Sequence, residues 1–345
     1  MRSGLPCAQC HTNPTGGGQR TPFAYQWARA TLVDNNPSLQ SFAQEFESAG
    51  STPWQGEVGN RLRIGGNLRT SLRSTNLPES EDSNRFESDR SLLFLTVDLL
   101  PNRLQLYVDE RLGPQGASNR ESFALLRLPG SLYLKAGRLF LPYGWRLEDD
   151  GALIRSFTGI NFDNPDDGME LGYLGSHWQG QLAITNGESG AGENDQGKQI
   201  SARLETLWPN WRLGVSLNRN DGSEGDRDMA NLFAGLRTGR AVWLVEFDHV
   251  LDQAANAPDL PDITSRLYLV EVDIEILQGH NLKLTTEGLE SDADDDNPRT
   301  RNSLIWEWFP LPYSELRAGA RILDDEDGVA TYDNEDYFFQ LNLYF

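Results

Sequence analysis

The sequence predicts an all-β fold, a 16-stranded antiparallel transmembrane β-barrel of the outer-membrane type, and three observations support this. From residue 54 onward, apolar and polar side chains alternate with a period of two. The connections between the predicted strands alternate between short and long. The last segment also alternates, and it ends on the aromatic residue Phe345. A short, partly helical plug at the N-terminus completes the expected fold.

The composition by itself would suggest a soluble acidic protein. The 345 residues carry a net charge of −21 and have a mean hydropathy of −0.53. No apolar run reaches the roughly 20 residues that a membrane helix needs, since the longest approach, Ser91 to Leu100, contains Asp98. A membrane barrel exposes only alternate residues to lipid, so these averages do not exclude one. The acidity argues against nucleic acid as a partner.

The first and last predicted strands show the alternation most clearly. In residues 61–73, one face carries four leucine or isoleucine side chains, and the other carries Arg61, Arg63, Arg69 and Arg73. A soluble sheet does not normally place four arginines on one face of a strand, whereas a water-filled lumen accepts them. The segment 335–345 is similar to the C-terminal assembly signal of outer-membrane barrels. A soluble β-sandwich or propeller is the alternative.

The remaining predicted strands follow in order along the chain. They are 86–100, 103–112, 120–128, 131–141, 168–175, 177–186, 198–208, 211–219, 229–238, 240–252, 263–276, 280–290, 300–309 and 314–324. Short connections should form the periplasmic end and long ones the extracellular end, which places both termini in the periplasm. Trp178, Trp208, Trp211 and Trp308 lie beside short connections, as expected for an aromatic girdle.

The N-terminal motif Cys7-Ala8-Gln9-Cys10-His11 contains both cysteines of the chain. In C-x-x-C-H, two thiols add to the vinyl groups of one haem and the histidine becomes an iron ligand. A thioredoxin-like site would need a βαβ context, and a zinc site would need further ligands that no second C-x-x-C or H-x₃-H supplies. We therefore expect one haem c, held by Cys7, Cys10 and His11.

The rest of the head, defined as residues 1–53, should wrap around this cofactor. Thr12 to Gly18 is rich in turn residues, and 22–32 and 37–47 have helix-compatible spacing. The head is too short for a core of its own, so we expect it to plug the barrel formed by residues 54–345. No apolar stretch of a secretory signal precedes Cys7. We expect the protein to be exported, with either a signal removed before this numbering begins or a true start upstream of Met1.

A second axial ligand of the haem iron is assigned from strand parity. His177 shares the parity of Gln179, opposite Trp178, and should point inward near a periplasmic turn. Met229 should also point inward, but near the extracellular end. His249, His280 and Met169 should face outward. His177 is therefore the preferred metal ligand beside His11, with Met229, water, a head residue or an open position as alternatives, and a single β-bulge would reverse the assignment.

The long connections are strongly acidic. The carboxylates include Glu79, Glu81, Asp82, Glu188, Glu193, Asp195, Asp221, Glu224, Asp226, Asp228, Asp292, Asp294, Asp295, Asp296, Asp324, Asp325, Glu326 and Asp327. Two interpretations remain open. The loops could provide solubility and divalent-cation contacts with lipopolysaccharide, or their field could concentrate cations such as Fe²⁺ at the outer mouth.

A C-x-x-C-H motif followed by a 16-strand porin resembles the fused outer-membrane monohaem cytochrome c–porin family. The resemblance rests on domain order, on the motif at residues 7–11 and on the barrel pattern. It implies electron transfer across the bacterial outer membrane, possible oxidation of extracellular Fe(II), and a periplasmic carrier such as a soluble cytochrome. No iron-site motif beyond the haem carries over, so the sequence leaves enzyme activity open. Residues 135–138 and 142–144 also resemble phosphate-selective porins, in which the third loop folds inward.

Three functions stay open at this point. The first is an electron-transfer cytochrome with a filled lumen. The second is a porin for small solutes or ions that carries a structural haem. The third is a barrel sleeve around a partner multihaem cytochrome. An open lumen favours the second function, and co-purification of a multihaem protein favours the third.

Overall fold

The computed structural model describes most of the chain. The described residues are 4–48, 56–76, 83–113, 116–147, 149, 151–160, 164–187, 196–222, 225–254, 261–293, 298–325 and 334–345. The helices are α1 (Cys7–Cys10), α2 (Pro22–Thr31), α3 (Pro37–Ser48) and α4 (Leu153–Thr158). The first strand, β1 (Glu57–Val58), is a two-residue segment that pairs only with β2. Among the described residues, no helix is long and apolar enough to cross a membrane.

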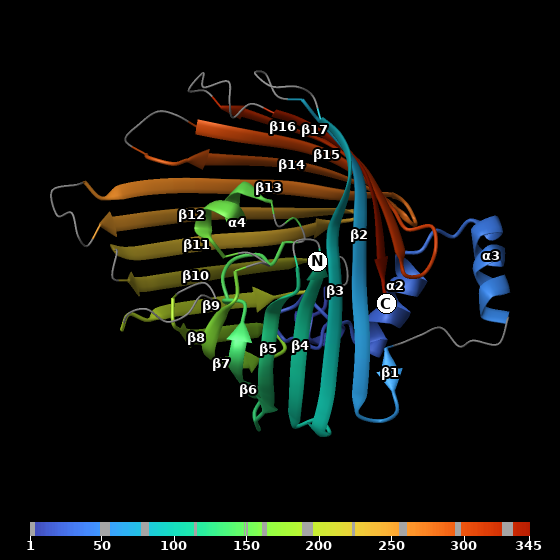
Figure 1. The fold of residues 1–345 in the computed structure, drawn as a ribbon, viewed down its shortest axis with the longest axis horizontal. Helices are drawn as coiled ribbons and strands as arrows, with labels where there is room; N and C mark the ends of the chain where they lie inside the picture. Colours follow the sequence, from blue (N-terminus) through green and yellow to red (C-terminus); the bar gives the residue numbers. More distant parts are fainter. Residues whose placement is uncertain are drawn as a thin grey trace.

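Sixteen longer strands follow among the described residues. They are β2 (Leu62–Asn76), β3 (Ser83–Leu100), β4 (Leu104–Gly113), β5 (Ser118–Arg127), β6 (Leu132–Leu139), β7 (Asp166–Leu174), β8 (Trp178–Thr185), β9 (Gln199–Leu207), β10 (Trp211–Gly222), β11 (Gly225–Thr238), β12 (Ala241–Ala254), β13 (Ile263–Leu277), β14 (His280–Glu290), β15 (Pro298–Trp308), β16 (Ser314–Asp325) and β17 (Asn334–Tyr344). Each pairs antiparallel with its neighbours in sequence, and β17 pairs with β2, which closes the ring (Figure 1). The predicted 16-stranded barrel is confirmed.

Strand β10 shows how the alternating sequence produces an inside-out barrel. Leu213, Val215 and Leu217 are 46%, 47% and 61% exposed on the outer face. Arg212 and Ser216, which point the other way, are 5% and 1% exposed. A soluble sheet would bury the apolar side of this strand. Here the apolar side is the exposed one, so the outer surface suits lipid and the polar side chains line the lumen.

The connections follow the predicted short and long alternation with one clear exception. Residues 220–228 were expected to form a long loop, but β10 and β11 pair as far as Gly222 and Gly225. The strands are therefore longer than the apolar alternation indicates. Here Asp221, Asp226 and Asp228 lie 2.6, 3.2 and 3.5 Å from nitrogens of Arg219, so these carboxylates form an ion-pair network rather than an unpaired acidic cluster.

Most of the other acidic loop residues lie outside the described residues. These are Glu79, Glu81, Asp82, Glu188, Glu193, Asp195, Glu224, Asp294, Asp295, Asp296, Glu326 and Asp327, together with the side chain of Asp325. The two interpretations of their charge therefore stay predictions.

The long segment between β6 and β7, here called loop 3 (residues 140–165), folds into the lumen. The amide of Trp145 donates to Glu246 at 3.1 Å, and the amide of Leu153 donates to Glu287 at 2.9 Å. Arg155 of α4 forms a buried ion pair with Glu246. Apolar residues of loop 3 pack with Met229, Phe233 and their neighbours on the lumen wall, in a cluster that also includes Tyr143, Trp145, Leu147, Ala152, Ile154, Ile160, Val250, Leu267, Leu269 and Leu289. The inward third loop that the porin resemblance implied is present.

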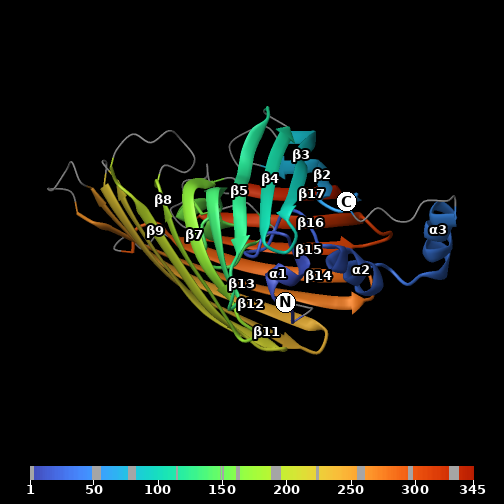
Figure 2. The same cartoon turned by 90° about the horizontal axis from the view of Figure 1, so that it is seen from below.

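Part of the head also occupies the barrel interior. Figure 2 shows α1 and the N-terminus within the outline of the strands, whereas α3 projects away from them in both views. The helices α2 and α3 match the predicted segments 22–32 and 37–47. The lumen therefore contains two parts of the same chain, the segment with the C-x-x-C-H motif and loop 3.

Candidate functional site

The C-x-x-C-H motif forms one helical turn followed by a glycine-rich turn. Helix α1 covers the two cysteines, and the amide of His11 closes it by donating to Cys7 O at 2.9 Å. The i, i+3 spacing places the two thiols on one side of the turn, and both are free. Gly18 has a φ of +60°, and a Cβ there would lie 1.9 Å from the Tyr107 hydroxyl oxygen. Only glycine therefore permits this close approach of the head to β4.

Fully buried polar contacts hold the motif against the lumen wall. The Asn13 side-chain amide donates to both carboxylate oxygens of Glu121 at 2.9 and 3.0 Å. Lys135 donates to the Asn13 oxygen at 3.4 Å. The Gln19 amide donates to the Tyr107 hydroxyl at 3.2 Å. Each partner lies on a strand far away in sequence, so these contacts fix the position of the motif segment inside the barrel.

Loop 3 meets the head at the same place. Arg146 donates to Glu121 at 3.0 Å and to the Thr15 hydroxyl at 3.3 Å. The amide of Phe140 also donates to Glu121, at 3.2 Å. Glu121 is 0% exposed and accepts bonds from the head and from loop 3 together. The barrel wall, the head and loop 3 are therefore joined through one carboxylate.

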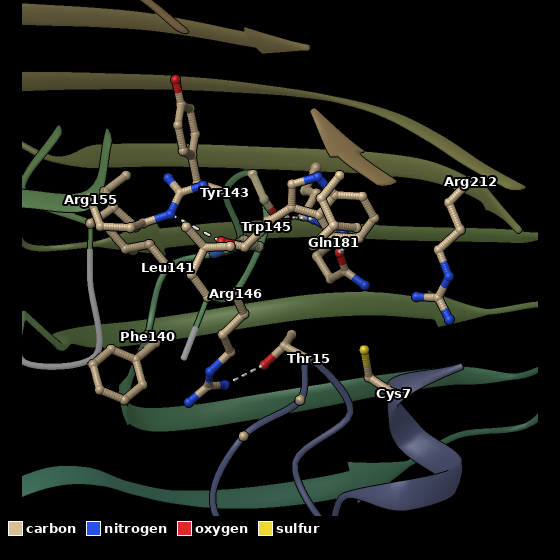
Figure 3. A pocket seen from close by; sticks show the side chains of 18 of the residues that line it. Cys7, Thr15, Phe140, Leu141, Tyr143, Trp145, Arg146, Arg155, Gln181 and Arg212 are labelled. Atoms are coloured by element: carbon tan, nitrogen blue, oxygen red, sulfur yellow. Dashed lines mark hydrogen bonds between the residues drawn. The ribbon is translucent and has the colours of Figure 1, made fainter. Parts of the chain in front are cut away.

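A cavity of about 310 Å³ lies between the motif and loop 3 (Figure 3). Cys7 and His11 line it from the head, and Figure 3 shows the Cys7 thiol directed toward the loop 3 side chains. The opposite wall is largely apolar and is formed by Phe140, Leu141, Tyr143, Trp145, Leu147, Ile160, Val242 and Leu244. Four arginines, Arg146, Arg155, Arg203 and Arg212, and two carboxylates, Glu271 and Asp273, also line the cavity. Apolar walls with a few polar or charged side chains are typical of ligand and cofactor pockets.

His11 is in the chemical state that metal binding requires. Burial, together with the nearby charges of Arg20 and Arg146, lowers the pKa of the imidazole to about 3, against smaller opposing effects of backbone hydrogen bonds with Gly17 and Gly18. The ring is therefore neutral near pH 7, and neutral imidazole is the form that binds iron. Its Nδ1 atom is buried and has no hydrogen-bond partner among the described residues. Burial likewise raises the pKa of the Cys10 thiol, with a contribution from Cys7.

The structure does not bring His177 to this cavity. His177 precedes β8 in a turn, its side chain is exposed, and its ring stacks on Trp208 with centroids 4.4 Å apart. Its Nδ1 lies 3.2 Å from Leu207 O. The expectation that His177 faces inward is wrong, because strand parity does not extend into the turn. Gln179 and Gln181, which are inside β8, are buried as expected.

The other residues sorted by parity mostly lie where expected. Met229 points inward and is 4% exposed, but it packs in the loop 3 cluster and does not line the cavity of His11. Met169 is 52% exposed and His249 is also exposed, both on the outer face. His280 lies at the barrel end, stacked with Trp306 and Trp308 at 5.7 Å each.

His280 belongs to a contact that sequence reasoning missed. Asp34 of the head lies 3.1 Å from His280 Nε2 and accepts from Trp308 Nε1 at 3.0 Å and from the Asn36 amide at 2.9 Å. The Asp34 amide donates to Phe309 O at 2.9 Å. Asp34 is thus the attachment of the head to the β14–β16 end of the barrel. The sequence offered no signal for it, because the pairing spans more than 240 residues.

We expect Asp34→Ala to loosen the head by about 2 kcal/mol, because charge-assisted hydrogen bonds contribute about 1.5–3 kcal/mol. Limited proteolysis of folded barrels should cleave residues 22–48 faster in this variant. Asp34→Asn keeps an acceptor oxygen and should be cleaved at a rate nearer that of the wild type. Equal cleavage of all three proteins would contradict the attachment.

The same contact should weaken at acidic pH. Burial opposes ionisation of Asp34, but hydrogen bonds from Trp308, Asn36 and His280 outweigh it and lower its pKa below the ordinary 3.8. A carboxyl with a lowered folded-state pKa stabilises the fold above its ordinary pKa and loses this contribution as pH falls through the lowered value. Cleavage of the wild-type head should therefore accelerate only below about pH 3.8.

The fold is a 16-stranded antiparallel β-barrel of the kind found in outer-membrane porins. The structure is similar to the anion-selective porin from Comamonas acidovorans, with a TM-score of 0.67 and 11% identity, covering 82% of this chain and 99% of that chain. It is similar to OmpT, an outer membrane protein of Vibrio cholerae, with a TM-score of 0.63 and 13% identity, covering 84% and 99%.

The outer membrane channel DcaP of Acinetobacter baumannii is also similar, with a TM-score of 0.63 and 11% identity over 82% of this chain and 97% of that chain. At these identities the likeness establishes the fold alone. No protein-family model matches the chain, and no curated protein matches it.

Proposed function

We propose that this chain is an electron-transfer protein of the bacterial outer membrane, in which a porin-like barrel holds one c-type haem. Cys7 and Cys10 would attach the haem and His11 would ligate its iron. The observation that carries the proposal is that Cys7 and His11 line a cavity inside the lumen. A haem held there would lie within the barrel, between the two sides of the membrane that the barrel spans.

The residues present fit a haem on three counts. The neutral His11 has a buried nitrogen without a partner. The wall opposite the motif is apolar, as a porphyrin requires. Arginines line the same cavity and can pair with the haem propionates. When bound, haem supplies a one-electron Fe(III)/Fe(II) couple. The chain's own contribution is to orient the motif through Glu121 and to exclude bulk water with loop 3.

The contents of the lumen weigh against the two alternatives. A solute porin needs an open path, and a sleeve needs room for a second cytochrome, whereas the head and loop 3 occupy this lumen and bond to each other through Arg146. The porin-like fold supports the solute channel as the second candidate function. With both termini in the periplasm, a soluble periplasmic carrier would exchange electrons at the end where Asp34 attaches the head, and extracellular Fe(II) is the proposed donor at the other end.

The test begins with covalent haem. Expressed in a host with c-type maturation machinery, the protein should stain for haem on a denaturing gel, and Cys7→Ala with Cys10→Ala should abolish the stain. A stain that survives both changes would contradict the attachment. The folded state of both proteins can be compared by their gel mobility without heating.

Electron transfer is then measured in vesicles that contain the barrel. A reductant outside should reduce a trapped redox dye faster with haem-loaded protein than with the Cys7→Ala/Cys10→Ala protein. Replacing the outside reductant by Fe(II) tests the proposed donor. Equal dye reduction with the two proteins would support the solute-channel alternative instead.

A further inference from the structure

Arg212 is a buried cation at the edge of the cavity. It lies at the start of β10 and is 5% exposed. One guanidinium nitrogen donates to Leu5 O of the head, and its Nε has no hydrogen-bond partner among the described residues. Figure 3 shows the guanidinium extending from its strand toward the segment that carries Cys7. The Arg212 guanidinium and the segment that carries Cys7 therefore both face the space between the head and the barrel wall.

The three other arginines of the cavity each have a carboxylate partner. Arg146 pairs with Glu121 at 3.0 Å, and Arg203 pairs with Glu205 at 3.1 Å. Arg155 pairs with Glu246. Within the described part of the chain, Arg212 has no carboxylate oxygen within 4.0 Å, and a backbone carbonyl is its hydrogen-bond partner. Arg212 is therefore the exception among the cavity arginines.

The buried Arg212 guanidinium needs an anionic partner. Guanidinium cannot discharge itself by losing a proton at physiological pH, and a buried charge without a counter-charge is strongly unfavourable. Its planar donors match the geometry of carboxylate and phosphate oxygens. The cavity beside Arg212 is large enough, at about 310 Å³, to admit such a group.

We propose that Arg212 binds an oxyanion, a carboxylate or a phosphate group, inside this cavity. Two sources supply the same chemistry. One is a haem propionate, in which case the inference rests on the proposed function. The other is a free anion from the periplasm, which would bind whether or not haem is attached.

The first experiment uses full-length protein that carries Cys7→Ser and Cys10→Ser, and therefore no haem. Titration with inorganic phosphate in a calorimeter should show binding. Adding Arg212→Gln should weaken it at least about tenfold, which corresponds to about 1.4 kcal/mol. Arg240→Gln is the matched control, because Arg240 lies at the same barrel end but is exposed and bonds to Ile276 O. Arg212→Lys keeps the charge and should bind phosphate with intermediate affinity. It replaces Arg212→Gln in the test if that variant fails to fold.

The second experiment distinguishes the sources in haem-loaded protein. If a propionate occupies Arg212, the loaded wild type should no longer bind phosphate, and Arg212→Gln should lower the haem midpoint potential. If the anion is free, the loaded protein still binds phosphate and the potential stays unchanged. Phosphate affinity unaffected by Arg212→Gln, together with an unchanged potential, would overturn the proposal. If the wild type carries no haem, the proposed function is contradicted. The phosphate titration alone then decides whether Arg212 binds an oxyanion.

Discussion

Deletion of residues 1–53 is expected to raise the single-channel conductance of the barrel at least about fivefold, because a 16-stranded barrel encloses an aqueous lumen unless something fills it. In the intact chain the motif segment bonds to Glu121, Lys135 and Tyr107 on the inner wall. Without the head these side chains face water. Loop 3 remains inside, so the conductance should stay below that of an open porin. Planar-bilayer recording gives the measurement.

Helix α3 provides the matched control for this deletion. It projects away from the strands, so deletion of residues 37–48 alone should leave the conductance unchanged (Figures 1 and 2). The interpretation of the head as a plug would be refuted if the full deletion and the intact protein conduct equally. A large increase after the α3 deletion would also contradict it.

Lys135→Met is expected to destabilise the barrel by about 3–5 kcal/mol, the usual effect of removing one partner from a buried ion pair. The Lys135 ammonium lies 3.0 Å from Glu170, and both side chains are 0% exposed. Tyr133 also donates to Glu170 at 2.6 Å. After the substitution, the Glu170 carboxylate would remain buried, with the Tyr133 hydroxyl as its side-chain hydrogen-bond donor among the described residues. Denaturant unfolding of the barrel in lipid vesicles measures the loss.

Two comparisons separate the lost charge pair from a simple packing defect. The double variant Lys135→Met/Glu170→Gln leaves no buried charge and keeps an acceptor for Tyr133, so it should recover most of the stability. Lys198→Met changes an exposed lysine and should shift the stability by less than about 0.5 kcal/mol. A double variant as unstable as Lys135→Met would show that the ion pair is not the cause.

The barrel was predictable because each strand repeats one simple rule. A side chain at every second position must suit lipid, and the others must suit a polar lumen, so position along the strand assigns the face. Leu68 and Leu72 face outward and Arg69 inward, as the alternation indicates. The rule fails at chain reversals and irregularities. His177 lies in a turn, and β3 has one extra residue, Asp89, opposite Arg69 and Thr70 of β2, which no sequence pattern marks.

Only the cysteines and the histidine of the candidate site were predictable from the sequence. C-x-x-C-H is contiguous, so spacing alone identifies Cys7, Cys10 and His11. The partners that fix this segment come from distant strands and from loop 3. Glu121 and Arg212 are ordinary lumen-facing residues by parity, and Asp34 is an ordinary polar residue of a connection. The contacts of Glu121 and Arg212 with the head, and of Asp34 with the barrel, have sequence separations of more than 100 residues.

By itself, then, the sequence determined the strand number, the faces of the strands and the C-x-x-C-H motif, because each of these depends on neighbours within a few positions. The tertiary structure decided that the motif lies beside loop 3, that Glu121 joins both to the wall, that His177 stacks on Trp208 away from the motif, and that Arg212 lacks a carboxylate. These outcomes depend on closing the ring, since only closure brings the inward side chains of β5, β6, β10 and β12 around one lumen.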